Sequence, residues 1–84
     1  MKSRNFILTL NNPDVTITEL SEICKRNGAT TFAGQLERGT QTGTVHAQFF
    51  IGFDNPRSLG SIKKWQPRAH IEPAKNAFRS FEYC

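Results

Sequence analysis

The chain has 84 residues, a length that suits one small domain. Hydrophobic residues make up 37% of the sequence and include seven Phe, so an aromatic core is possible and a disordered chain is excluded. No apolar run reaches the roughly 18 residues that indicate a transmembrane helix. The apolar run after the basic start is also too short for a signal peptide.

The formal net charge is +4 and the isoelectric point is about 9.5. A basic domain suits an anionic partner, most often nucleic acid, although many small domains are basic without a specific reason. Cys24 and Cys84 form neither a disulfide framework nor a CxxC metal motif. Cys24 lies at helical spacing from Ile17 and Leu20, so we expect a small core residue in a reducing, intracellular setting.

Apolar periodicity and turn residues predict seven helices and strands, with a turn and a loop between them. In chain order we expect a strand over 4–11, a turn over 11–14, a helix over 16–28, a strand over 29–37, a loop over 38–43, a strand over 44–53, a short helix over 55–65, a strand over 68–74 and a helix over 74–84. Thr16 can cap the first helix, with Glu19 three residues on, and Gly28 can close it.

The order of these elements predicts an α+β fold. Strand, helix, strand, strand, helix, strand is the split β-α-β pattern of ferredoxin-like and RRM-like folds, with an antiparallel sheet flanked by helices. No closing signal follows the last helix at Cys84. We therefore expect residues 1–84 to be a single N-terminal domain cut from a longer protein.

The hairpin over 29–53 brings three polar residues together. His46 and Gln48 alternate with an apolar face on the third strand. If the hairpin is symmetric about residues 41 and 42, Glu37 lies opposite His46 and Gln35 lies opposite Gln48. A carboxylate, an imidazole and an amide suit Mn²⁺ or Mg²⁺ better than a structural zinc. The alternative is an ordinary polar strand face with a Glu37–His46 ion pair.

Three ordered motifs resemble those of a known family. They are "NFILTLNNP" near the start, "HAQ" with a Glu nine residues upstream, and "FEYC" on the last predicted helix. Together they resemble the replication initiator (Rep) endonucleases of the HUH type from circular single-stranded DNA viruses, the circovirus and nanovirus group. The resemblance covers nearly the whole chain, and "RAHIEPAK" is similar to the segment that precedes the nucleophile in that group.

The resemblance implies a role for four residues. Its metal ligands correspond to Glu37, His46 and Gln48, because the group's second motif includes a His-hydrophobic-Gln variant. Its nucleophile corresponds to Tyr83, and its lysine three residues later would fall beyond Cys84. The implied activity is nicking and joining of single-stranded DNA through a 5′-phosphotyrosine, with Mn²⁺ or Mg²⁺ as cofactor, in rolling-circle replication.

The resemblance also implies partners and a location. They are single-stranded DNA at an origin stem-loop, a helicase domain following this one, host replication machinery and the host nucleus, with no membrane partner. Candidate DNA contacts are Lys2, Arg4, Asn11, Arg38, Arg57, Lys63, Lys64, Trp65, Arg68, Lys75 and Arg79. Trp65 beside two lysines suits stacking of a base, but it suits a place at the edge of the core equally well.

Several polar residues have an ordinary interpretation as well. Asn11 and Asn12 suit a turn first and a DNA contact second. His70 and Glu72 share a predicted strand face with Arg68, where they could support the site, touch DNA or simply be solvated. Two other functions stay open for the whole chain. One is a non-catalytic RRM-like single-stranded nucleic-acid binder, and the other is an oligomerising ferredoxin-like interaction module.

Overall fold

The computed structural model describes residues 2–38 and 43–74. The elements are β1 (Lys2–Asn11), α1 (Ile17–Arg26), β2 (Thr31–Arg38), β3 (Val45–Ser58), α2 (Leu59–Lys63) and β4 (His70–Pro73). The helix predicted over 74–84 lies outside the described residues from residue 75 onward. Within the described ranges, neither helix is long and apolar enough to cross a membrane.

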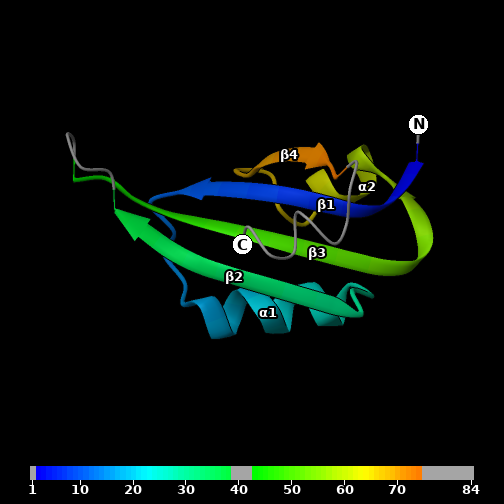
Figure 1. The fold of residues 1–84 in the computed structure, drawn as a ribbon, viewed down its shortest axis with the longest axis horizontal. Helices are drawn as coiled ribbons and strands as arrows, with labels where there is room; N and C mark the ends of the chain where they lie inside the picture. The colour runs from blue at the N-terminus through cyan, green and yellow to red at the C-terminus, as the bar shows by residue number, and fades with distance from the viewer. Residues whose placement is uncertain (1, 39–42, 75–84) are drawn as a thin grey trace.

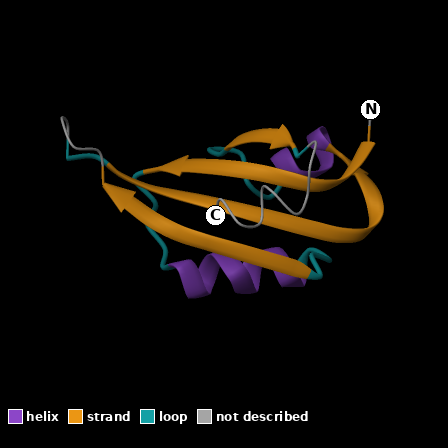
Figure 2. Cartoon of the chain, in the orientation of Figure 1, coloured by secondary structure: helices purple, strands orange, loops and turns teal. Residues whose placement is uncertain are grey.

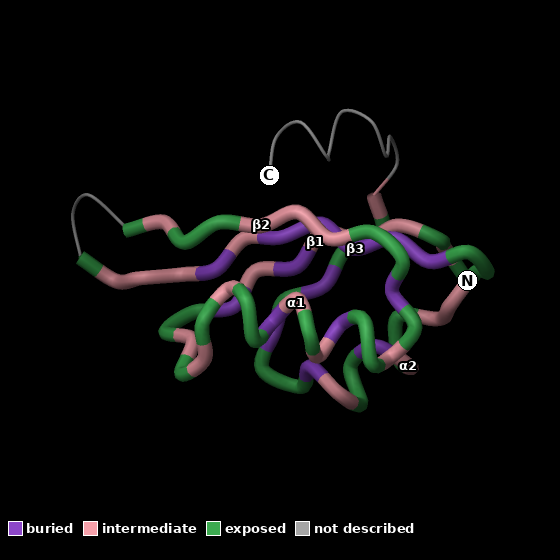
Figure 3. The backbone as a smooth tube through the Cα atoms, turned by 90° about the horizontal axis from the view of Figure 1, so that it is seen from below, coloured by how far each residue is buried: buried purple, intermediate pink, exposed green. Residues whose placement is uncertain are grey.

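The four strands form one antiparallel sheet in the order β2-β3-β1-β4 (Figure 1, Figure 2). β3 is inserted between β1 and β2, which is the split β-α-β arrangement. Seen from the side, α1 and α2 lie on the same side of the sheet (Figure 3). The predicted α+β, ferredoxin-like class is therefore confirmed, and the sheet has one face covered by α1 and α2.

The covered face holds the hydrophobic core, because alternate strand residues point to the same side of a sheet. Leu20 and Cys24 of α1 and Ile62 of α2 are buried against it, and Cys24 is the core residue that its spacing predicts. The strands supply the other large buried side chains, Phe6, Leu8, Leu10, Phe49, Ile51, Phe53 and Ile71. This packing stabilises the sheet from one side. The polar residues at alternate strand positions point to the opposite side.

α1 begins and ends where its capping residues predict. The Glu19 backbone N–H donates to Thr16 Oγ1 at 3.1 Å, which satisfies one of the free N–H groups of the first turn. The helix closes at Arg26, and Gly28 follows with a φ of +97°. Glycine suits this left-handed position because a Cβ would be strained there.

The helix predicted over 55–65 is wrong at its start, because α2 begins only at Leu59. β3 continues to Ser58, where it pairs with Lys2 of β1. Pro56 lies in an irregular section of this pairing, so its missing N–H breaks no regular ladder bond. Ser58 then caps α2 by accepting from a backbone N–H of its first turn.

Candidate functional site

Two rows of polar side chains cross the sheet face opposite the helices. Residues paired across antiparallel strands point to the same face, so each row follows from the register. From β2 toward β4, the first polar row is Glu37, His46 and Asn11, and the second polar row is Gln35, Gln48, Thr9 and His70. The predicted pairing of residue 37 with 46 and of residue 35 with 48 is confirmed.

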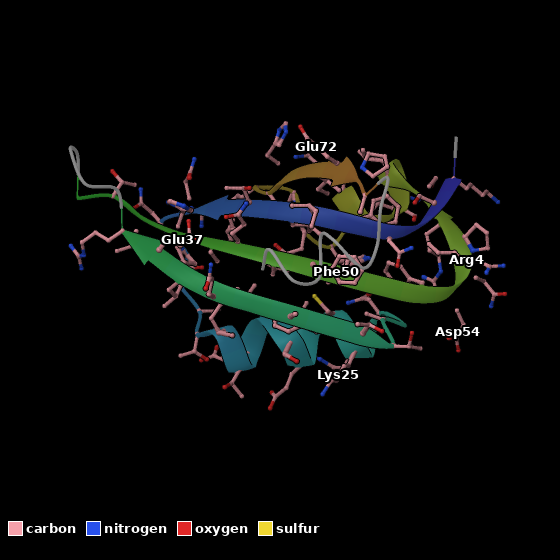
Figure 4. The ribbon with its side chains drawn as sticks, viewed as in Figure 1. Arg4, Lys25, Glu37, Phe50, Asp54 and Glu72 are labelled. Carbon is pink, nitrogen blue, oxygen red and sulfur yellow. The ribbon has the colours of Figure 1, made fainter. Side chains whose placement is uncertain are left out.

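Glu37 and His46 contact each other directly at the start of the first polar row. Glu37 Oε2 lies 3.0 Å from His46 Nε2, and the two side chains are 39% and 27% exposed. This is the cross-strand pair that the ordinary interpretation predicted. It also shows that both side chains turn toward the same point, near the end of β2 where Figure 4 labels Glu37.

Gln35 is a further residue of the site that the sequence reasoning missed. Its Nε2 donates to Glu37 Oε1 at 2.7 Å, so each oxygen of the carboxylate has a different partner. The signal for this contact was available in the alternation of β2. Residues two apart on a strand lie on the same face, and an amide two residues before a carboxylate can reach it.

The donors of the two rows fit a hard divalent cation. A carboxylate oxygen and an imidazole nitrogen are ligand types that such an ion can take, although the two atoms here contact each other directly at 3.0 Å. Gln48 lies two residues from His46 on the same strand face and can add an amide oxygen. Within residues 2–38 and 43–74, no group of three or more His, Cys, Asp or Glu could hold a metal ion. The candidate set therefore depends on Gln48.

β4 carries a second polar pair on the same sheet face. His70 Nε2 lies 2.9 Å from Glu72 Oε1, and both side chains are about two-thirds exposed or more. His70 is opposite Thr9 in the second polar row, which places β1 between this pair and Gln48. The two pairs are thus separate along the face, as the labels of Glu37 and Glu72 indicate in Figure 4.

Arg68 does not share the strand face of His70, because β4 begins only at His70. Arg68 Nη2 donates instead to the backbone carbonyls of Asn11 and Asn12, at 2.9 and 3.2 Å, and Nη1 lies 3.8 Å from Asp14. Asn12 has a φ of +49°, the left-handed conformation that a turn asparagine tolerates. The turn role expected for Asn12 is confirmed, and Arg68 fixes that turn beside the first polar row.

Two other predicted DNA contacts also donate to backbone carbonyls. Arg57 Nη1 lies 3.2 Å from Asn27 O, and its guanidinium stacks 4.7 Å from the ring centroid of Phe53. Arg38 Nη1 donates to Gly43 O at 3.3 Å. In this structure, Arg57 joins the end of β3 to the carboxyl end of α1, where a cation is also favourable to the helix dipole.

The cluster of Lys63, Lys64 and Trp65 at the end of α2 has one residue packed on the core and two at the surface. Trp65 is partly buried and packs against the core, which is the non-functional interpretation of the two given for it. Lys63 and Lys64 are both exposed, and Lys63 Nζ donates to Ala69 O. Arg4 is exposed too, but it lies at the opposite end of the sheet from Glu37 (Figure 4). Within residues 2–38 and 43–74, the predicted DNA contacts therefore lie at both ends of the sheet.

The predicted nucleophile lies outside the described part of the chain. Tyr83 and the two basic residues before it, Lys75 and Arg79, belong to residues 75–84. Their proposed roles rest on the sequence and on the comparison with known proteins.

The sequence matches a known family over almost its whole length. The model of a family described as "Putative viral replication protein" matches residues 3–84. The chain belongs to this family. It is also 39% identical, over an 85-residue alignment, to the Replication-associated protein of Beak and feather disease virus. The alignment covers 96% of the chain and 28% of that viral protein. The predicted resemblance to Rep proteins of circular single-stranded DNA viruses is thereby confirmed.

Proposed function

We propose that this domain nicks and rejoins single-stranded DNA at a viral replication origin. The observation that carries the proposal is the Glu37–His46 pair of the first polar row beside Gln48 of the second. Glu37 and His46 turn toward one point on the open sheet face, with Gln48 beside them, in a chain that belongs to a viral replication protein family. That face lies on the side of the sheet away from α1 and α2.

Glu37, His46 and Gln48 are the proposed ligands of a Mn²⁺ or Mg²⁺ ion. When bound, such an ion supplies Lewis-acid stabilisation of the charge that develops on a phosphate under attack. His46 must present an unprotonated nitrogen to act as a ligand, so its present contact with Glu37 has to open. Three protein ligands leave further coordination positions for water and for phosphate oxygens.

Tyr83 is the proposed nucleophile. Its phenolic oxygen forms a bond to phosphorus while the bond from phosphorus to the 3′ oxygen breaks, and the departing 3′ oxygen takes up a proton. The products are a 5′-phosphotyrosine and a free 3′-hydroxyl, and the reverse reaction rejoins a strand. Because a tyrosine ionises only near pH 10, its proton must be lost during attack. Arg79, four residues earlier, would stabilise the phenolate if this segment is helical.

The wider role proposed for the full protein follows the family. The chain spans about 28% of the length of the viral relative that it matches. We propose that the remainder includes a helicase domain, that the target is an origin stem-loop, and that the protein acts in the host nucleus with host replication machinery. A basic domain with a net charge of +4 suits such a polyanionic target.

A non-catalytic RRM-like binder is the alternative. Such modules bind bases on aromatic side chains of the open sheet face. Among the described residues of the face opposite α1 and α2, β1 to β4 supply a single Phe, Tyr or Trp, which is Phe50. The same face presents the Glu37–His46 pair instead. These two features favour the nuclease over the binder.

Adduct formation tests the proposed function. A protein that extends beyond Cys84, to include the position of the family lysine, is incubated with an oligonucleotide carrying the loop of its viral origin. We expect a protein–DNA adduct on a denaturing gel in Mn²⁺ and none in EDTA. Tyr83→Phe should abolish the adduct and keep DNA affinity, because only the attacking oxygen is lost. His46→Ala should abolish it through the metal site.

One outcome would contradict the assignment of the nucleophile, and another would contradict the function itself. An adduct that persists in Tyr83→Phe would mean that the nucleophile is another residue. Unchanged DNA affinity in EDTA, together with no cleavage by the parent protein under any metal condition, would identify a binder without catalysis.

A further inference from the structure

Gln35 decides which oxygen of Glu37 is free to bind a cation. We propose that Gln35 is a positioning residue that holds Glu37 as a one-oxygen ligand and thereby makes the site select Mn²⁺ or Mg²⁺ against Ca²⁺. The inference rests on the proposed function, because it takes Glu37 and His46 as ligands.

The two carboxylate oxygens of Glu37 are in different environments. Oε1 accepts from Gln35 Nε2 at 2.7 Å, a short separation typical of a hydrogen bond to an ionised acceptor. Oε2 lies 3.0 Å from His46 Nε2 and faces the neighbouring strand. A carboxylate accepts hydrogen bonds only, so Gln35 must present its NH₂ group to Oε1. Oε2 is therefore the oxygen directed toward a cation shared with His46.

This arrangement discriminates between cations by coordination. Ca²⁺ takes about six to eight oxygen ligands at roughly 2.3–2.6 Å and often uses both oxygens of one carboxylate. Mg²⁺ and Mn²⁺ favour octahedral sites, and Mg²⁺ binds one carboxylate oxygen at about 2.1 Å. Using Oε1 as a second ligand oxygen requires the Gln35 bond to break, whereas binding through Oε2 alone leaves it intact. Ca²⁺ binding through both oxygens therefore carries the free-energy cost of breaking the hydrogen bond between Gln35 and Glu37.

Gln35 can be changed without disturbing the core. It is exposed, lies on the edge strand β2 and belongs to the open face. A residue that only stabilised the fold would change the affinities for Mn²⁺ and Ca²⁺ together. A residue that selects the binding mode of Glu37 must change their ratio.

The test measures Mn²⁺ and Ca²⁺ affinities by calorimetry without DNA. Gln35→Leu removes the N–H donor. We expect the ratio of Mn²⁺ to Ca²⁺ affinity to fall about tenfold, in line with other partners that orient metal ligands. Gln35→Asn, which is too short to reach Oε1, should lower the ratio in the same way. Gln35→Lys keeps an N–H donor beside Oε1, so the ratio of Mn²⁺ to Ca²⁺ affinity should equal that of the parent protein. Both cations should bind more weakly than to the parent, because the lysine adds a positive charge.

Thr31→Val is the matched control, because it removes a polar group from the same face of β2 opposite Gly52, away from Glu37. Its ratio should equal that of the parent protein. A parent-like ratio in both Gln35→Leu and Gln35→Asn would overturn this inference while leaving the metal site in place. Mn²⁺ binding that is absent from the parent, or unaffected by His46→Ala, would overturn the proposed function and this inference with it.

Discussion

Cys24 shows how strongly the core changes the chemistry of a single residue. Its side chain is fully buried between α1 and the sheet. Desolvation disfavours the thiolate and raises the pKa of the Cys24 thiol from its ordinary value of 9.0 to about 12, against a smaller opposing effect of a backbone hydrogen bond. The thiol therefore stays protonated in the folded domain, where it is unavailable as a nucleophile at neutral pH.

This pKa shift predicts an alkaline loss of stability. Below pH 9 both the folded and unfolded chains keep the proton, and the stabilisation is complete. Between pH 9 and about 12 the unfolded thiol loses its proton while the folded thiol keeps it. The free energy of unfolding should then fall, by at most about 1.4 kcal/mol per pH unit. Urea unfolding at several pH values, compared with Cys24→Ala, isolates this contribution.

Cys84→Ser should be present in both proteins, so that Cys24 is the only thiol under comparison. Parallel curves for Cys24→Ala and the parent from pH 8 to 11 would contradict the predicted shift. A rapid reaction of the folded parent with a thiol reagent at pH 8 would contradict its burial.

The arginines show what a sequence leaves undetermined at the scale of one residue. Composition and position predict Arg57 and Arg68 as phosphate contacts, and this stays a prediction. What the sequence did not indicate is that their guanidinium groups donate to the distant backbone carbonyls of Asn27 and Asn11. The partners are 30 and 57 residues away, so no local pattern indicates them. By contrast, the pairing of Glu37 with His46 could be predicted from the sequence. The two residues are nine positions apart in one hairpin, and the assumption that this hairpin is symmetric gives their register.

At the scale of elements, Gly34 controls how closely β2 approaches β3. A Cβ at Gly34 would lie 2.7 Å from Phe49 Cβ and 3.2 Å from the ring of Phe32. The strands must therefore separate to accept a side chain there. Glu37 lies three residues along the same strand, so its contact with His46 depends on this close pairing.

Gly34→Ala should consequently weaken both the fold and the metal site. We expect the free energy of unfolding to fall by about 1–3 kcal/mol, the usual range for overpacking, and Mn²⁺ affinity to fall with it. Gly60→Ala is the matched control, because a Cβ at Gly60 meets nothing within 4 Å and alanine favours the helix by about 0.5–1 kcal/mol. A Gly34→Ala protein as stable as Gly60→Ala in urea would contradict the close approach.

The elements that were predicted well are those defined by neighbouring residues. Thr16 and Gly28 placed the ends of α1 within two residues, because caps act locally. The extension of β3 through Pro56 to Ser58 was missed for the opposite reason. The last residues of β3 pair only with the far end of β1, across an irregular section, so no neighbouring residue indicates this pairing. A proline after a turn residue also resembles the start of a helix in the local sequence.

At the scale of the whole molecule, the sheet separates the hydrophobic core from the proposed site. One face carries the buried aromatic and aliphatic side chains packed by α1 and α2. The other face carries the two polar rows and the separate pair on β4. Substitutions in the polar rows should therefore change binding with little effect on folding, and the position of a bound cation on this face decides the function proposed here.

Paramagnetic broadening by substoichiometric Mn²⁺ tests the central claim most directly. In NMR spectra of the parent protein, we expect the strongest loss of amide signals around Glu37, His46 and Gln48, reversed by EDTA. Gln48→Ala should require more Mn²⁺ for the same effect, because it removes one proposed ligand. Broadening centred on His70 and Glu72, or spread evenly over the domain, would contradict a cation site at Glu37, His46 and Gln48 and the nicking chemistry built on it.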